Sequence, residues 1–150
     1  MVRNGSNGLF LQNQTVNAFK QLDSYSCGPS ALAFFLFALG RKFTIARIRK
    51  ELKPTKENGT SHEAIERMLH RRRIDFESKS NAAISDLKPP SLVNYQYLGE
   101  GHYGVILSVT QKYISLFEPW FAKTHLYTRK AFERQWHSNR YGRRWAVNAL

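Results

Sequence analysis

The chain has 150 residues, of which 42% are apolar and 13% aromatic, and it carries a formal net charge of +12 at pH 7. This length and apolar content suit one domain, residues 1–150, built around one hydrophobic core. The single cysteine excludes an internal disulfide framework, and the longest apolar run, 31–39, is far shorter than the roughly 20 residues that cross a bilayer.

The first segment, 1–17, is predicted to be an extended lead-in because it is polar, contains glycine and shows little hydrophobic periodicity. At most one short strand is expected there, around 9–11. The N-terminus lacks the basic start, apolar stretch and small-residue cleavage site of a secretory signal. We therefore expect a cytoplasmic protein.

A buried helix is predicted to follow this lead-in. Pro29 suits the first turn of a helix, and the next residues, 31–39, are apolar on every side. Gly40 can adopt the left-handed conformation that ends helices. This assignment places Cys27 at the N-terminal end of the helix.

Two amphipathic helices are predicted after the buried one. The second helix covers 44–52, with Thr44 as its N-cap and a basic outer face. The third begins with a capping box formed by Thr60 and Glu63, and it ends in the cationic run 70–73. Helices therefore dominate the first half of the chain.

The hydrophobic period changes from helical to strand-like after residue 90. A last short helix is expected from its cap at Thr128 to Trp136. Helices followed by an antiparallel meander predict an α+β fold, with the helical part packed on a C-terminal antiparallel sheet. The predicted strands are 92–98, 102–110, 112–117, 124–127 and 145–147.

Cys27 and His102 form the first candidate catalytic pair. An ordinary thiol has a pKa of about 8.5, and it becomes a thiolate more readily at a helix N-terminus or beside an imidazolium. Cys27 has the first of these environments in the predicted helix, and His102, at the head of a predicted strand, could supply the second. The sequence therefore predicts a thiol nucleophile with a histidine base.

A base of this kind needs an acceptor to orient its ring, and the reaction needs donors for an oxyanion. Glu118 ends the strand after that of His102, so a hairpin turning near 110–111 would bring the two side by side. Asn94 or a backbone carbonyl is the alternative orienting group. Gln21, six residues before Cys27, could fold over the thiol and donate to the oxyanion together with the Cys27 N–H.

Four stretches of the sequence together resemble a known family, the bacteriocin-processing, double-glycine-leader cysteine peptidases. These stretches are QLDSYSCGPSAL (21–32), PSLVNY (90–95), HYGVI (102–106) and FEPW (117–120). The resemblance spans about 21–136 and implies a papain-like fold without cofactors. It also implies catalytic roles for Cys27 and His102 and an oxyanion role for Gln21.

One position departs from that family, because Glu118 stands where an aspartate is usual before the proline. The departure leaves open a degenerate domain that binds a peptide or an acidic partner without cutting, and the same chemistry would serve a thiol deamidase or acyltransferase. Cleavage after a double glycine is not assumed.

Other functional classes have weaker support. His62 and Glu63 begin like a zinc-peptidase helix, but Glu66 stands where the second histidine ligand belongs, so no metal is expected. The sequence has no glycine-rich phosphate loop after a strand, so no nucleotide cofactor is expected either. The expected partner is a peptide or protein substrate, and the net charge favours an acidic one. Nucleic acid is ranked last because aromatic residues do not alternate with the basic clusters.

Overall fold

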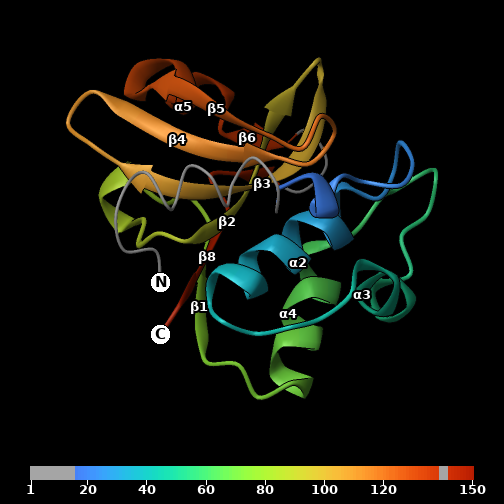
Figure 1. Ribbon diagram of the computed structural model, residues 1–150. Helices are drawn as coiled ribbons and strands as arrows, with labels where there is room; N and C mark the ends of the chain where they lie inside the picture. Colours follow the sequence, from blue (N-terminus) through green and yellow to red (C-terminus); the bar gives the residue numbers. More distant parts are fainter. Residues whose placement is uncertain (1–15, 139–141) are drawn as a thin grey trace.

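The structure is a computed structural model that describes residues 16–138 and 142–150. Helices occupy the first part of the described chain and strands most of the rest (Figure 1). The predicted strand at 9–11 and nearly all of the predicted lead-in lie outside the described residues, and the last two residues of that lead-in belong to η1. The helices before the sheet are η1 (Val16–Phe19), α2 (Cys27–Ala38), α3 (Ile45–Leu52) and α4 (His62–Arg71).

The central helix α2 begins at Cys27, as the sequence predicted. Every residue over 28–36 is buried, because a helix that is apolar on all sides has to be covered on all sides. After its C-cap, Gly40 has a φ of +80°, the left-handed conformation expected there. The Phe34 ring stacks on Phe117 with ring centroids 4.1 Å apart, which fixes α2 against the sheet.

The amphipathic helices α3 and α4 are capped by side chains at their N-termini. In α3, Thr44 accepts the predicted hydrogen bond from the backbone three residues later, at 3.1 Å. In α4 the cap is Ser61, whose hydroxyl accepts an equivalent bond at 3.1 Å. The predicted capping box of Thr60 and Glu63 is therefore wrong by one residue. Thr60 is buried instead, and its carbonyl accepts the Tyr103 hydroxyl.

Six strands of the described chain form one antiparallel sheet in the order β1-β8-β2-β3-β4-β5. The predicted meander is its central part, and a helix α5 (Arg129–Gln135), capped by Thr128, follows β5. The edge strand β1, the 3-10 helix η2 (Ile84–Asp86) and the separate pair β6–β7 were not predicted from the sequence. The strands are β1 (Phe76–Lys79), β2 (Ser91–Tyr97), β3 (Glu100–Val109), β4 (Tyr113–Glu118), β5 (Lys123–Thr128), β6 (His137–Ser138), β7 (Gly142–Arg143) and β8 (Ala146–Ala149).

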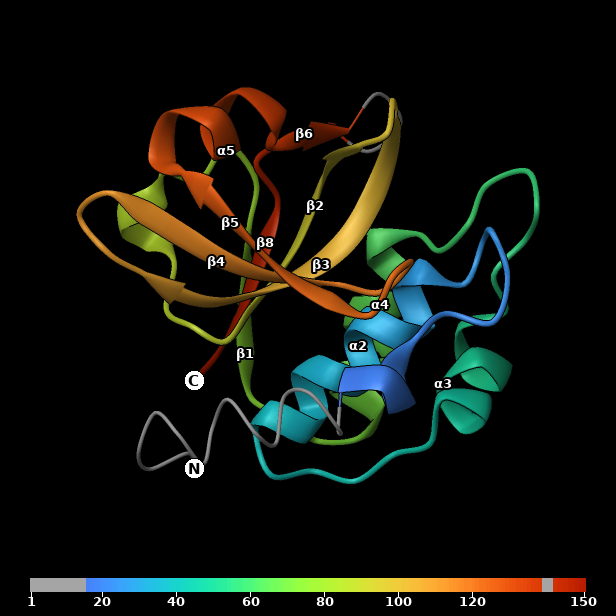
Figure 2. The same cartoon turned by 45° about the horizontal axis from the view of Figure 1, so that its top comes forward.

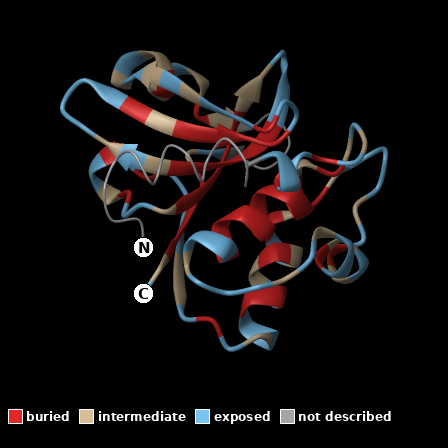
Figure 3. Cartoon of the chain, in the orientation of Figure 1, coloured by how far each residue is buried: buried red, intermediate tan, exposed pale blue. Residues whose placement is uncertain are grey.

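Helices lie on both faces of the sheet (Figure 2), and one hydrophobic cluster lies on each face. On one face α2, α3 and α4 cover the side chains of Leu92, Val105 and Phe117. On the other face α5 and η2 cover Tyr95 and Ile106. Figure 3 shows buried residues concentrated along α2, α4 and the middle of the sheet. The predicted α+β arrangement, with helices packed on an antiparallel sheet, is confirmed.

None of the helices in the described part of the chain has both the length and the apolar character needed to cross a membrane.

Candidate active site

Cys27 reaches the sheet where two of its strands separate. Pairing between β3 and β4 ends at Val105 and Phe117, so the first residues of β3 pair with β2 alone. The helix α2 packs against β3, and Cys27 is its first residue. The thiol is therefore held at the free edge of β3, beside His102 and Tyr103.

The hydrogen-bond partners of the Cys27 thiol are His102 and Tyr103 of β3 and Gly28 of α2. Burial by itself raises the pKa of the thiol, but the charge and hydrogen bond of His102 and the backbone N–H groups of Tyr103 and Gly28 outweigh burial, and the pKa of Cys27 is lowered. Cys27 is partly buried. The site therefore favours a thiolate, and Tyr103 contributes to it through its backbone, which no sequence motif indicated.

The His102 ring lies between the thiol and a carboxylate. Its Nε2–H donates to Glu118 Oε2 at 2.6 Å, which leaves Nδ1 to face Cys27. Burial lowers the pKa of His102, but Cys27 and then Glu118 raise it more strongly, to about 9. The ring also stacks on Tyr97, with centroids 5.1 Å apart. These contacts favour an imidazolium paired with a thiolate.

Glu118 is fully buried at the end of β4. Besides His102, its carboxylate accepts the backbone N–H of Trp120 and, at 2.9 Å, that of Phe121. Burial raises the pKa of Glu118, but the bonds from His102 and these two N–H groups lower it overall. The turn at Pro119 thus folds back so that its N–H groups bind the Glu118 carboxylate, and this carboxylate in turn binds the His102 imidazole. The geometry matches the predicted hairpin, in which β3 and β4 bring His102 and Glu118 side by side.

Gln21 is attached to the same turn through its backbone. Its N–H donates to the Pro119 carbonyl at 2.9 Å, and its side-chain Nε2 donates to the Asp23 carbonyl at 2.6 Å. Gln21 is buried. The Asp23 carbonyl accepts one of the two side-chain N–H groups of Gln21, and the second can donate to another acceptor.

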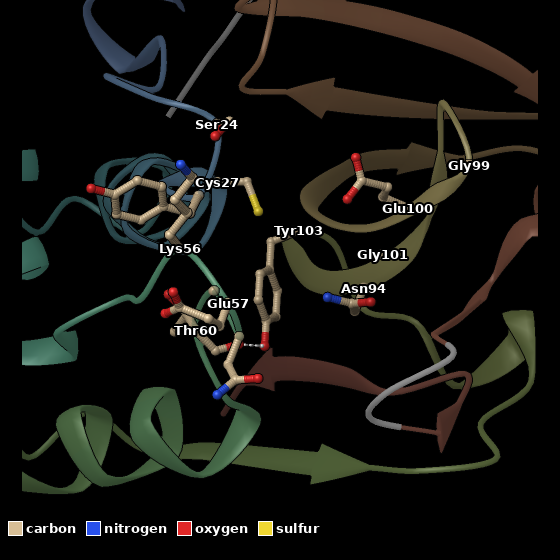
Figure 4. A pocket seen from close by; sticks show the side chains of 13 residues that line it. Ser24, Cys27, Lys56, Glu57, Thr60, Asn94, Gly99, Glu100, Gly101 and Tyr103 are labelled. Atoms are coloured by element: carbon tan, nitrogen blue, oxygen red, sulfur yellow. Dashed lines mark hydrogen bonds between the residues drawn. The ribbon is translucent and has the colours of Figure 1, made fainter.

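A pocket of about 480 Å³ opens beside Cys27 (Figure 4). One wall is the loop 56–60 between α3 and α4, and another is formed by residues 99–101, where the turn after β2 leads into the start of β3. Gly28 allows the first wall to come close, because a Cβ there would lie 2.5 Å from Thr60 Oγ1. Asn94, the alternative orienting group for His102, lines this pocket instead.

Tyr103 connects the pocket to the helical side of the sheet. Its hydroxyl donates to the Thr60 carbonyl at 2.7 Å and lies 2.7 Å from His62 Nδ1. The His62 ring stacks on Trp145 with centroids 3.9 Å apart. His62 is thus a buried residue that supports the pocket wall. Within the described residues, His, Cys, Asp and Glu side chains form no group of three that could hold a metal ion.

Comparisons with known proteins found a matching family model and two similar proteins. The model of the peptidase C39 family matches residues 15–140. A protein of unassigned function from Methanothermobacter thermautotrophicus is 35% identical over 104 residues, which are 66% of this chain and 68% of that protein. A similar protein from Methanothermobacter marburgensis is 34% identical over 105 residues, or 67% and 69% of the two chains.

Two solved structures share the fold. The peptidase domain of Streptococcus ComA, a bifunctional ABC transporter involved in quorum sensing, has a TM-score of 0.69 at 22% identity, covering 87% of this chain and 95% of that one. A double-glycine-motif protease from an AMS/PCAT transporter, in complex with the leader peptide, has a TM-score of 0.72 at 13% identity, covering 87% of both chains. These likenesses confirm the predicted papain-like fold.

Proposed function

The chain belongs to the peptidase C39 family, and from this premise we propose that it is a cysteine peptidase that hydrolyses a peptide bond without a cofactor. In this proposal Cys27 is the nucleophile and His102 its acid and base. The observation that carries the proposal is the line of contacts from the partly buried Cys27 thiol through the His102 ring to the buried Glu118.

The proposed reaction uses the thiolate and the imidazolium in turn. The Cys27 sulfur attacks the substrate carbonyl carbon, a C–S bond forms, and the carbonyl electrons move to the oxygen. When this intermediate collapses, the C–N bond breaks and His102 gives its proton to the departing amine. Water then attacks the acyl carbon while His102 takes one of its protons, so that a C–O bond forms. The C–S bond then breaks, the carboxylic acid product departs, and the Cys27 thiolate and the His102 imidazolium are restored.

The oxyanion of this intermediate needs donors that point to one place. The backbone N–H of Cys27 lies in the first turn of α2, where N–H groups have no acceptor within the helix. The second side-chain N–H of Gln21 is the other proposed donor. Glu118 is proposed to orient the imidazole and to stabilise its charge.

Peptides are the proposed substrates, because a leader peptide is bound in the structure of the double-glycine-motif protease that shares this fold. A second candidate function is peptide binding without cleavage. It is favoured by one observation, that the Gln21 carboxamide already donates to the Asp23 carbonyl. The two candidates differ in whether the substrate is cut.

A peptide mixture distinguishes them. We expect the wild-type chain to cleave peptides derived from a denatured proteome, detected by mass spectrometry as new N-termini, and Cys27→Ala and His102→Ala to cleave almost none. Because Cys27 is the chain's one cysteine, treatment with iodoacetamide should abolish the activity in step with its alkylation. Cleavage that persists in Cys27→Ala would show that the thiol is not the nucleophile, and binding without cleavage would favour the second candidate.

A further inference from the structure

The loop between η1 and α2 carries both proposed oxyanion donors, and Asp23 contacts it at both ends. The backbone carbonyl of Asp23 accepts the Gln21 side-chain N–H at 2.6 Å. The carboxylate of Asp23 accepts the Ser26 hydroxyl at 2.5 Å and the Tyr25 N–H at 3.2 Å. Because Ser26 directly precedes Cys27, Asp23 holds the loop on the side of each donor.

The bond to Asp23 decides how the Gln21 carboxamide is turned. The atom 2.6 Å from the Asp23 carbonyl oxygen has to be the amide nitrogen, because two oxygens at that distance would repel each other. The carboxamide oxygen Oε1 of Gln21 is buried and has no hydrogen-bond partner among the described residues. The Asp23 carbonyl therefore sets the direction of the second side-chain N–H, which is the one proposed to bind the oxyanion.

Ser26 precedes α2 but does not cap it with its side chain. A serine at this position usually accepts the N–H of the second or third residue of the helix. The third residue, Pro29, has no N–H, and the N–H of Gly28 is a partner of the Cys27 thiol. The fully buried Ser26 donates its hydroxyl to Asp23 instead. Asp23 thereby holds the start of α2 and leaves the N–H of Gly28 to the thiol.

Arg49 of α3 holds the Asp23 carboxylate from outside the loop. Its guanidinium nitrogen lies 2.7 Å from Asp23 Oδ2, and its guanidinium carbon lies 5.3 Å from the centroid of the Tyr25 ring. The two side chains are 29% and 30% exposed, so salt and water screen this pair less than a fully exposed one. Arg49 thus ties the loop to α3, a helix that supplies none of the site residues described above.

We propose that Asp23 and Arg49 are positioning residues of the oxyanion donors, Asp23 by holding Gln21 and the start of α2, and Arg49 by holding Asp23. This inference rests on the proposed peptidase function. Neither residue contacts the substrate. They keep the two donor N–H groups aimed at one place, and the stabilisation of an oxyanion depends on that alignment. The loss of Arg49 should therefore slow a step that forms an oxyanion and leave other reactions of the thiol unchanged.

Two reactions of the Cys27 thiolate separate this role from a general effect on the fold. In acylation by p-nitrophenyl acetate, the sulfur attacks the ester carbonyl, an oxyanion forms, and p-nitrophenolate leaves. In alkylation by iodoacetamide, the sulfur displaces iodide from a saturated carbon, and no oxyanion forms. Arg49→Ala should lower the acylation rate constant roughly five- to tenfold and leave the alkylation rate constant and its pH profile unchanged. Arg49→Lys, which keeps the positive charge, should recover part of the loss.

Arg72→Ala is a matched control for the loss of an ion pair. Arg72 also pairs with a carboxylate, that of Glu51, and its guanidinium carbon lies 5.6 Å from the centroid of the Phe43 ring. This variant should keep both rate constants. In a Gln21→Ala background, Arg49→Ala should slow acylation less than it does in the wild type. Equal acylation by Arg49→Ala and Arg72→Ala, or an equal fall in alkylation, would overturn the assignment.

These measurements need no peptide substrate, so they separate the positioning role from the peptidase proposal. If the expected loss of acylation is seen and the wild type cuts no peptide, the peptidase proposal fails and the positioning role stands. If the wild type cuts peptides, Arg49→Ala should lower kcat with little change in KM, because the oxyanion contacts form only in the transition state. Peptide cleavage that is unaffected by Arg49→Ala would refute the positioning role and leave the peptidase proposal intact.

Discussion

Replacing His102 by alanine should make the Cys27 thiol harder to ionise. In the wild type, burial raises the pKa of the thiol, and the charge and hydrogen bond of His102 do most to offset that rise. His102→Ala removes both and leaves only the backbone N–H groups of Tyr103 and Gly28 against the desolvation. The thiol then keeps its proton at neutral pH, and its reactivity falls.

The size of this change in thiol ionisation can be judged from the pKa of His102, the other member of the pair. The pKa of His102 rises from 6.5 to about 9, which corresponds to roughly 3 kcal/mol in favour of the imidazolium. Cys27 supplies the two leading favourable contributions to this rise, ahead of Glu118. The interaction acts equally on both partners, so its loss should reduce the thiolate population at pH 7 by about tenfold or more.

Iodoacetamide labelling against pH measures this population directly, because Cys27 is the chain's one cysteine. We expect the wild-type labelling midpoint to lie below that of a free thiol, about 8.5, and the midpoint of His102→Ala to lie above that of the wild type. Circular dichroism spectra of the two proteins should match, which controls for folding. A wild-type midpoint at the free-thiol value that does not move in His102→Ala would refute the ion pair.

Three further changes test other parts of the structure. Burial lowers the pKa of His62 from 6.5 to about 4, so the unfolded state takes up a proton before the folded state does as the pH falls. The free energy of unfolding should therefore drop by about 2 kcal/mol from pH 7 to 5. Urea titrations at both pH values should show a smaller drop in His62→Phe. Glu118→Asp shortens the side chain that accepts the His102 hydrogen bond at 2.6 Å, and it should lower kcat/KM by about ten- to hundredfold. An unchanged kcat/KM would mean that a group other than Glu118 orients the His102 ring. In Gly104→Ala the new Cβ would lie 2.9 Å from the Phe117 carbonyl oxygen, so the free energy of unfolding, measured by heat or urea, should fall by about 1–3 kcal/mol. An unchanged free energy of unfolding would mean that β4 can shift away from β3 at no cost.

Local patterns in the sequence were sufficient to predict the elements that carry the candidate site. An apolar run closed by Gly40 indicated a helix starting at Cys27, and α2 starts there. Alternating residues around a turn at 110–111 indicated the β3–β4 hairpin, and its register places His102 near Glu118. In each case the signal lies within a short stretch of chain, where periodicity and turn residues decide the structure.

Features that depend on distant parts of the chain could not be predicted in this way. The strand β1 pairs with β8, and its four residues show no alternation of buried and exposed positions. The N–H of Tyr103 reaches the thiol only because β4 has separated from β3 at that point. The pocket walls come from two loops that meet only in the folded chain. Tertiary contacts of this kind leave no local pattern in the sequence.

The net positive charge of the chain bears on how a charged partner approaches it. Part of the positive charge on α3 and α4 is compensated, since Arg49 pairs with Asp23 and Arg71 and Arg72 pair with Glu51. The remainder still favours an acidic partner at long range, because the net charge of +12 acts over about a Debye length. A peptide with acidic residues should therefore reach the candidate active site faster than a neutral one, and added salt should narrow the difference.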